Sequence, residues 1–215
     1  MDTFFIGNNS TDVSINEIAV FNDRIYAATE NGIFYADSNN PNLIDFNNWN
    51  TITLANNNFK NITVFNNKLY TILNSQLYEV NEMNELEFIT DFSSTVTGLK
   101  ESSTNLSVAF DSSVIVYDTQ LIQTFQNSAD SDFDYTLNTA FVENNQLFLA
   151  TNQFGVLSST SLEVIAFSEI HPEGPVSNDV FSVTANNNHL WAVYGGYTTT
   201  MAPIQPNLGY SHYDG

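Results

Sequence analysis

The chain has 215 residues, of which 42% are hydrophobic and only 13% are charged. Its 24 acidic residues far outnumber its 4 lysines and arginines, which gives a formal net charge of −20. This balance argues against nucleic-acid binding and against docking on an anionic membrane, because both depend on Lys and Arg. The lack of cysteine excludes disulfides and thiolate zinc sites, and no apolar run is long enough for a transmembrane helix.

Pairs of short apolar strands recur along the chain, and a polar turn separates the two strands of most pairs. In the first pair, residues 18–21 precede residues 24–29, and the turn residues lie between them. An aliphatic residue anchors the second strand of each pair and recurs every 37–44 residues: Ile25, Leu69, Leu106, Leu147 and Leu190. A period of this length that contains only strands is typical of β-propeller blades.

Two further strands follow the first pair in the clearest repeats. Third strands are expected at residues 32–36 and 76–80, and fourth strands at residues 49–53 and 86–90. Asn-Asp, Asn-Asn and Asn-Gly pairs separate the strands, and these residues favour tight turns because they tolerate left-handed backbone angles. The sequence therefore predicts an all-β chain, a β-propeller built of about five four-stranded repeats.

The two ends of the chain leave two arrangements open. Residues 3–6 read as a fourth strand without a blade of its own, and the last repeat stops at a third strand in residues 208–213. In one arrangement, the N-terminal strand completes the last blade and closes a five-bladed ring without an open edge. In the other, the chain is part of a larger seven-bladed or double propeller. The first residues lack the basic and apolar regions of a signal peptide, so we do not expect this chain to be exported by itself.

Two groups of segments resemble known propeller families. Residues 2–7, 18–32 and especially 40–49, which read Asn-Pro-Asn-Leu-Ile-Asp-Phe-Asn-Asn-Trp, resemble the propeller region of PorZ-like proteins. These proteins belong to the type IX secretion system of Bacteroidetes. Residues 173–183 and 190–193 resemble the repeat of sensor propellers in hybrid two-component regulators. PorZ-like proteins are commonly grouped with those propellers, so the two resemblances agree.

The resemblance implies a larger exported protein with two seven-bladed propellers and a C-terminal sandwich that carries the secretion signal. On this comparison, residues 1–175 form blades that close one propeller, and residues 176–215 form a further blade that opens a second one. The implied role is a non-catalytic scaffold at the outer surface of the outer membrane. It would deliver anionic lipopolysaccharide to a surface sortase and its attachment-complex proteins. The alternative is a periplasmic, glycan-sensing propeller of a hybrid two-component regulator.

The histidines give no specific sign of catalysis. His171, His189 and His212 lie near turns or ends of different predicted elements, so we expect them at the surface. A Ser-His-Asp triad needs a histidine held by an acid and facing a serine, and many unrelated trios of these common residues could be chosen. We therefore predict no catalytic residues and no enzyme activity.

The acidic residues also fail to indicate a specific site. Asp130, Asp132 and Asp134 have the alternate spacing of a calcium loop, but the Gly and Glu that complete such a loop are missing. We therefore predict no metal and no cofactor. Paired catalytic carboxylates would have to converge on the central channel of a propeller. Four acids lie near the edges of the predicted inner strands: Glu17, Glu101, Glu143 and Asp179.

Aromatic side chains are expected to pack between blades, and Trp191 on a second strand is predicted to lie in a core. One segment differs, because residues 195–206 form a long insertion between the second and third strands of the last repeat. Long loops on a rigid scaffold are where propellers bind partners. Tyr197 and Met201 are therefore our candidate contact residues, and the alternative is a loop without a binding role.

Overall fold

The computed structural model divides the chain into two compact units, Met1–Glu169 and Ile170–Gly215. The residues that the structure describes are 6–7, 12–52, 57–127, 133–163, 166–170, 175–177, 180–204 and 208–214.

The first unit contains four antiparallel four-stranded sheets, which we call blades 1 to 4. In each blade the strands are hydrogen bonded in chain order, so every strand pairs with its neighbour in sequence. Blades 1 and 2 consist of β1 (Ile15–Phe21), β2 (Arg24–Thr29), β3 (Gly32–Asp37), β4 (Asn50–Thr51), β5 (Asn61–Phe65), β6 (Lys68–Leu73), β7 (Gln76–Val80) and β8 (Leu86–Asp91). Blades 3 and 4 consist of β9 (Val96–Glu101), β10 (Leu106–Phe110), β11 (Val114–Tyr117), β12 (Gln123–Asn127), β13 (Leu137–Glu143), β14 (Gln146–Thr151), β15 (Gly155–Ser159) and β16 (Phe167–Ile170). The predicted four-stranded repeat is confirmed four times.

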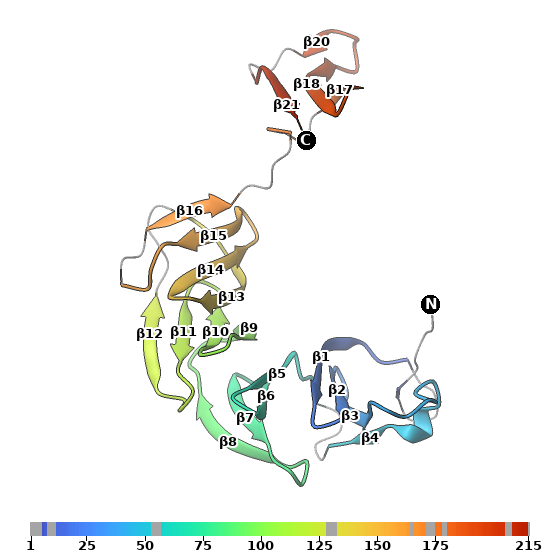
Figure 1. The fold of residues 1–215 in the computed structure, drawn as a ribbon, viewed down its shortest axis with the longest axis vertical. Helices are drawn as coiled ribbons and strands as arrows, with labels where there is room; N and C mark the ends of the chain where they lie inside the picture. The colour runs from blue at the N-terminus through green and yellow to red at the C-terminus, as the bar shows by residue number, and fades with distance from the viewer. Residues whose placement is uncertain are drawn as a thin grey trace. The chain divides into compact units, whose positions relative to one another are not determined.

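The first strands of the four blades lie next to one another along the inner side of this unit. Strand β1 contacts β5, β5 contacts β9, and β9 contacts β13. Figure 1 shows these strands on the concave side of the unit, with the fourth strands of the blades along the outer rim. Polar side chains on the first strands can therefore reach from one blade to the next.

The hydrophobic core lies between neighbouring blades. One cluster joins blades 1 and 2 around Ile33 and Leu69, a second joins blades 2 and 3 around Leu77 and Leu99, and a third joins blades 3 and 4. The second strands β2, β6 and β10 carry buried residues on both faces, and all five residues of β10 are buried, whereas in β14 only alternate residues are buried. A strand covered on both sides reads as a continuous apolar run, which explains the anchors that recur in the sequence.

Asparagine pairs form the predicted tight turns. Asn22 and Asp23 connect β1 to β2 with φ angles of 48° and 58°, and Asn66 and Asn67 connect β5 to β6 with 46° and 57°. The corresponding turns in blade 4 and in the second unit also use two consecutive asparagines with positive φ. Two left-handed residues in a row define the turn type that matches the twist of a β-hairpin, so these asparagines have a structural role.

The stretch that resembles PorZ-like proteins forms the connection from β3 to β4. A short 3-10 helix, η2 (Phe46–Asn48), begins after Asp45, whose side chain accepts a hydrogen bond from the Asn47 backbone N–H at 3.0 Å. The indole N–H of Trp49 donates to the carbonyl oxygen of Leu43 at 3.0 Å. Trp49 also packs against a small cluster formed by Ile6, Ala27 and Phe34. The motif therefore stabilises a loop of blade 1. Of the predicted strand at residues 3–6, Ile6 is buried in this cluster, and residues 3–5 lie outside the described residues.

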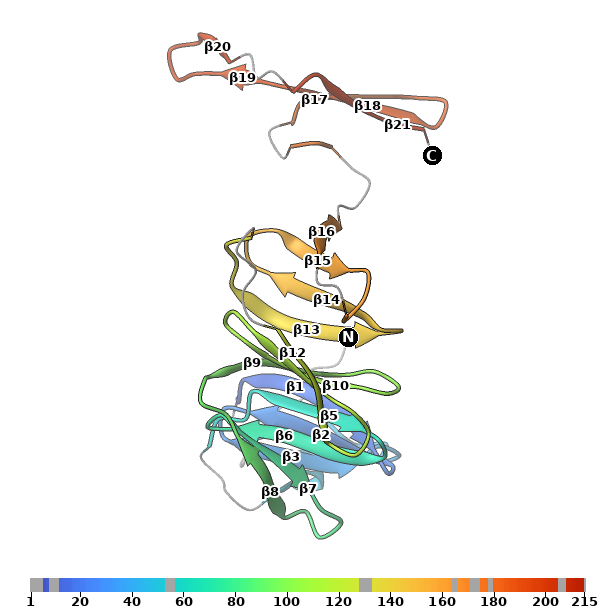
Figure 2. The same cartoon turned by 90° about the vertical axis from the view of Figure 1, so that its left-hand side faces the viewer.

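The second unit contains a three-stranded sheet in the order β17 (Val180–Asn186), β18 (His189–Tyr194), β21 (Tyr210–Tyr213). The predicted third strand is thus confirmed at the end of the chain. The insertion before it forms a hairpin of β19 (Gly196–Tyr197) and β20 (Pro203–Ile204), which extends from the sheet in Figure 2. Among the described residues of this unit only Ala192 is buried. The prediction that Trp191 lies in a core is wrong, because its side chain is only partly buried.

Candidate functional site

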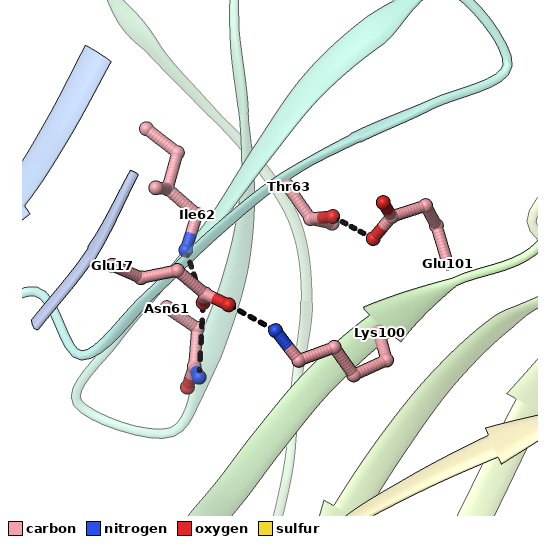
Figure 3. Close-up of polar contacts among 6 residues, drawn as sticks. All are labelled: Glu17, Asn61, Ile62, Thr63, Lys100 and Glu101. Carbon is pink, nitrogen blue, oxygen red and sulfur yellow. Dashed lines mark hydrogen bonds and ion pairs between the residues drawn. The ribbon is translucent and has the colours of Figure 1, made fainter. Parts of the chain in front are cut away.

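The inner strands carry a polar network that joins three blades. Glu17 of β1 accepts a hydrogen bond through Oε2 from the backbone N–H of Ile62 at 3.1 Å, and the Asn61 amide lies 3.4 Å from the same oxygen. Its other oxygen, Oε1, forms an ion pair with Lys100 of β9. Figure 3 shows the Glu17 carboxylate between these groups from β5 and β9. One carboxylate therefore links blades 1, 2 and 3.

Glu101 of β9 is a second carboxylate that links neighbouring blades, here blades 2 and 3. The Thr63 hydroxyl of β5 donates a hydrogen bond to Glu101 of β9, as Figure 3 also shows. Glu143, another acid predicted near the channel, ends β13 opposite Gln146, and Asp179 lies outside the described residues. Glu17 and Glu101 thus bind donors of neighbouring blades, and each serves as a fixed acceptor that joins strands.

A cleft of about 440 Å³ between blades 1 and 2 gathers two of the four basic side chains of the protein. Arg24 donates to the Asn84 side chain at 3.3 Å, and its guanidinium lies 5.2 Å from the centre of the Tyr35 ring. Lys68 forms an ion pair with Glu79 at 2.7 Å. The cleft also contains Asn22, Asn67, Asn81, Glu82 and Glu87.

Both cations of this cleft keep their charge at neutral pH. A hydrogen bond with Tyr26 raises the pKa of Arg24, and the bond to Glu79 raises the pKa of Lys68. Amides, cations and carboxylates that line one concave surface can bind a ligand rich in hydroxyl groups. Because more than forty positions separate Arg24 of blade 1 from Lys68 of blade 2, the sequence pattern did not predict the cleft.

The predicted contact residues lie on the hairpin of the second unit. The side chain of Tyr197 is 57% exposed, and its ring meets the Phe181 ring edge-on with centres 5.8 Å apart. Met201 is 76% exposed at the hairpin turn, where its φ is 61° and its N–H donates to the Thr198 carbonyl oxygen at 2.9 Å. Both side chains are accessible on this unit, and a binding role for them stays a prediction.

Two histidines that the sequence placed in separate elements meet on the second unit. His189 begins β18 and His212 lies on β21, and their Nδ1 and Nε2 atoms are 3.0 Å apart. The Trp191 ring lies nearly parallel to the His212 ring, with centres 4.8 Å apart. The alternation of residues 189 and 191 places two rings on one face, and the predicted third strand pairs with the second, but the register that sets Trp191 opposite His212 was not predicted. His171, Asp130 and Asp132 lie outside the described residues.

Comparisons with known proteins identify the fold. No protein-family model matches the sequence, and no curated protein matches it. PorZ, an essential bacterial surface component of the type-IX secretion system of Porphyromonas gingivalis, has a TM-score of 0.60 over 94% of this chain at 16% identity. The extracellular domain of a hybrid two-component system from B. thetaiotaomicron has a TM-score of 0.54 over 94% of this chain at 15% identity. This chain has a β-propeller fold.

The same fold occurs in structural neighbours of different kinds. The AfRom2 CNH domain has a TM-score of 0.57 over 97% of this propeller chain at 11% identity. The chain spans 28% of the length of PorZ and 27% of the two-component chain, but 76% of the AfRom2 domain. PorZ is a bacterial surface component, and the two-component structure is an extracellular domain. In the described part of the propeller, no helix is long and apolar enough to cross a membrane.

Proposed function

We propose that this chain is a non-catalytic binding propeller that works outside the cytoplasm, at the cell surface or in the periplasm. The observation that carries the proposal is the likeness to PorZ, a surface component of a secretion system, over almost the whole chain. The non-catalytic part of the proposal is supported by Glu17 and Glu101, because these inner-strand acids accept hydrogen bonds from neighbouring blades. In this reading, residues 1–175 supply blades of one propeller and residues 176–215 begin another.

The more specific form of the proposal is delivery of anionic lipopolysaccharide to a surface sortase and its attachment-complex proteins. A net charge of −20 opposes the approach of an anionic polysaccharide. The cleft with Arg24 and Lys68 holds two of the four basic side chains beside Glu79, Glu82 and Glu87, and it is the place where we expect the anionic ligand to bind. The exposed Tyr197 and Met201 would serve as contacts for the protein partner.

The test is binding of purified anionic lipopolysaccharide to the 215-residue chain, compared with a neutral polysaccharide of similar length. We expect the double variant Arg24→Ala/Lys68→Ala to weaken binding of the anionic ligand at least about tenfold, since charge-assisted contacts are lost. The matched control is Lys60→Ala, which removes an exposed cation outside this cleft. Equal binding by the double variant and the control would contradict the role of the cleft.

A pull-down with the full-length protein tests the partner. We expect capture of the sortase or of its sugar carrier, and weaker capture by Tyr197→Ala and Met201→Ala. Repeated absence of both partners would contradict the delivery role.

The second candidate is a glycan-sensing propeller of a hybrid two-component regulator, which the similarity to the B. thetaiotaomicron extracellular domain supports. This function predicts a transmembrane helix and a kinase encoded downstream of the propeller. It also predicts binding of a defined oligosaccharide without capture of a sortase. The two functions therefore differ in the partner that the full-length protein binds.

A further inference from the structure

The pair of histidines on the second unit has the geometry of a shared binding point. The centres of the His189 and His212 rings are 5.1 Å apart and their planes differ by 19°. The facing Nδ1 and Nε2 atoms are 3.0 Å apart. The distance between the ring centres is close to the sum of the nitrogen–nitrogen distance and the two ring radii, so the rings lie edge to edge. The two nitrogens therefore lie between the rings and face the same small space.

The sheet pairing brings the histidines together and holds them there. In the β18–β21 ladder, Trp191 lies directly opposite His212. His189 lies two residues before Trp191, so all three side chains project from the same face of the sheet. The Trp191 ring contacts both imidazoles, with planes 28° from His189 and 13° from His212. These contacts hold the two imidazoles next to each other on one face of the sheet.

We propose that His189 and His212 bind a divalent transition-metal cation, and that Cu²⁺ binds most tightly. Imidazole nitrogens that share one metal lie roughly 3 Å apart when they occupy adjacent positions at the usual metal–nitrogen distance of about 2.0 Å. The observed 3.0 Å separation fits this arrangement. Among first-row divalent ions, Cu²⁺ has the highest affinity for nitrogen sites. Because the two nitrogens face each other, each ring must turn by roughly 40° before its lone pair points at a shared metal about 2.0 Å away, and the metal then takes the place of the hydrogen bond between them.

The remaining coordination positions of this site belong to water. Among the residues that the structure describes, no three His, Asp or Glu side chains lie close enough together to hold a metal. His212 is exposed and His189 is partly buried, so solvent reaches the pair. The net charge of −20 raises the local concentration of cations around the chain. The site is thus a two-histidine surface site, independent of the function proposed above.

A metal at this site would join the last strand to the sheet. Strand β21 pairs only with β18 among the described strands of this unit, and the β19–β20 hairpin separates the two strands in sequence. The bound cation would add a second connection across the same ladder. We therefore expect metal binding to protect the backbone amides of β21 from hydrogen exchange.

The experiment is a Cu²⁺ titration of the 215-residue chain in a Trp49→Phe background. The sequence contains two tryptophans, so the remaining tryptophan fluorescence, excited selectively over the tyrosines, comes from Trp191, which contacts both imidazoles. We expect saturable quenching with one Cu²⁺ per chain. His189→Gln and His212→Gln should each weaken the apparent affinity at least about tenfold, because one of the two protein ligands is lost.

The matched control is His171→Gln, which removes the third histidine of the chain and should leave the affinity unchanged. Electron paramagnetic resonance of the Cu²⁺ complex of the unsubstituted chain gives an independent readout. We expect the Cu²⁺ signal to show coupling to two imidazole nitrogens in the unsubstituted chain. In His189→Gln or His212→Gln it should show coupling to one. Quenching that does not saturate, or that is equal in His189→Gln and His171→Gln, would overturn the proposal. The pair would then be a hydrogen bond between two imidazoles.

Discussion

Charged side chains are scarce in this propeller, and the inner strands use them to join blades. The Glu17 side chain is 18% exposed and Lys100 is 42% exposed, so water screens the lysine more than the carboxylate. The carboxylate also accepts from the backbone N–H of Ile62. A partly buried acceptor with several donors contributes more than an exposed ion pair, because removing it leaves donors unsatisfied. We therefore expect Glu17 to contribute more to stability than Lys100 does.

We predict that Glu17→Ala lowers the free energy of unfolding by about 1.5–3 kcal/mol, the range for hydrogen bonds to a charged group. Lys100→Ala should cost less than about 1 kcal/mol, as is usual for an exposed partner of an ion pair. Urea denaturation of each variant measures both effects. The exposed Glu82→Ala, in a loop of blade 2, is the control and should leave stability unchanged. Equal losses from Glu17→Ala and Lys100→Ala would show that the ion pair alone matters.

A second residue-scale prediction concerns high pH. Burial raises the pKa of Tyr70 and of Tyr117 above the ordinary value of 10.0. The folded chain therefore keeps these phenol protons at pH values where the unfolded chain has released them. Stability should be unaffected below pH 10 and should fall as the pH rises from 10 through the raised values.

The measurement is urea denaturation at a series of pH values, together with the tyrosinate absorbance of the folded chain. Tyr70→Phe and Tyr117→Phe should each make the loss of stability above pH 10 less steep. Tyr210→Phe is the control, because Tyr210 is 68% exposed. If none of these substitutions changes the pH dependence of stability above pH 10, the loss of stability comes from other groups.

At the scale of elements, the blades depend on close approach of their inner strands. Gly98 of β9 faces β13 of the next blade, and a Cβ at this position would lie 2.5 Å from Thr139 Oγ1 and 2.9 Å from the Asn138 carbonyl oxygen. Real Cβ atoms do not approach a backbone atom this closely. The absence of a side chain at residue 98 is therefore a packing requirement between blades 3 and 4.

We predict that Gly98→Ala lowers the free energy of unfolding by about 1–3 kcal/mol, as overpacking of a core usually does. The double variant Gly98→Ala/Thr139→Gly should recover part of this loss beyond the effect of Thr139→Gly alone, since two of the three close contacts come from the Thr139 side chain. Thermal unfolding of the four proteins in this cycle measures the coupling. Additive losses would show that the Thr139 contact does not determine the cost.

At the scale of the whole molecule, burial is distributed unequally between the two units. The described strands of the first unit share three clusters of buried residues between blades. In the second unit, Ala192 alone is buried among the described residues, and Phe181, Val183 and Tyr210 are exposed. Because local stability follows buried apolar contact, the two units should differ in their resistance to local unfolding.

We predict that backbone amides of β6, β10 and β14 exchange with solvent most slowly, and that those of β17, β18 and β21 exchange fastest. The reason is that β6 and β10 carry buried residues on both faces and β14 on one face, where they pack against neighbouring blades. Hydrogen exchange followed by mass spectrometry of the chain measures both groups in one experiment. Equal protection of β18 and β10 would contradict the prediction, because it would mean that hydrogen exchange does not follow the difference in burial between the two units.

Much of the fold could be predicted from local patterns. The anchors Ile25, Leu69, Leu106 and Leu147 recur because every second strand of the first unit packs at least one face against a neighbouring blade, and this requirement is visible in the sequence itself. The asparagine pairs mark turns because few other residues adopt two left-handed conformations in succession. The sequence alone therefore determined the strand order, the turns and the repeat of the propeller.

The polar sites depended on the tertiary structure. Glu17 and Lys100 lie in different blades, and His189 meets His212 across an inserted hairpin. Strand periodicity states which side of a strand a residue occupies, but it does not state which distant strand lies opposite. Trp191 was misplaced for the same reason, since burial depends on what covers a face. Long-range packing decided which side chains meet, because a side chain makes its contacts in space and the sequence pattern records only its neighbours along the chain.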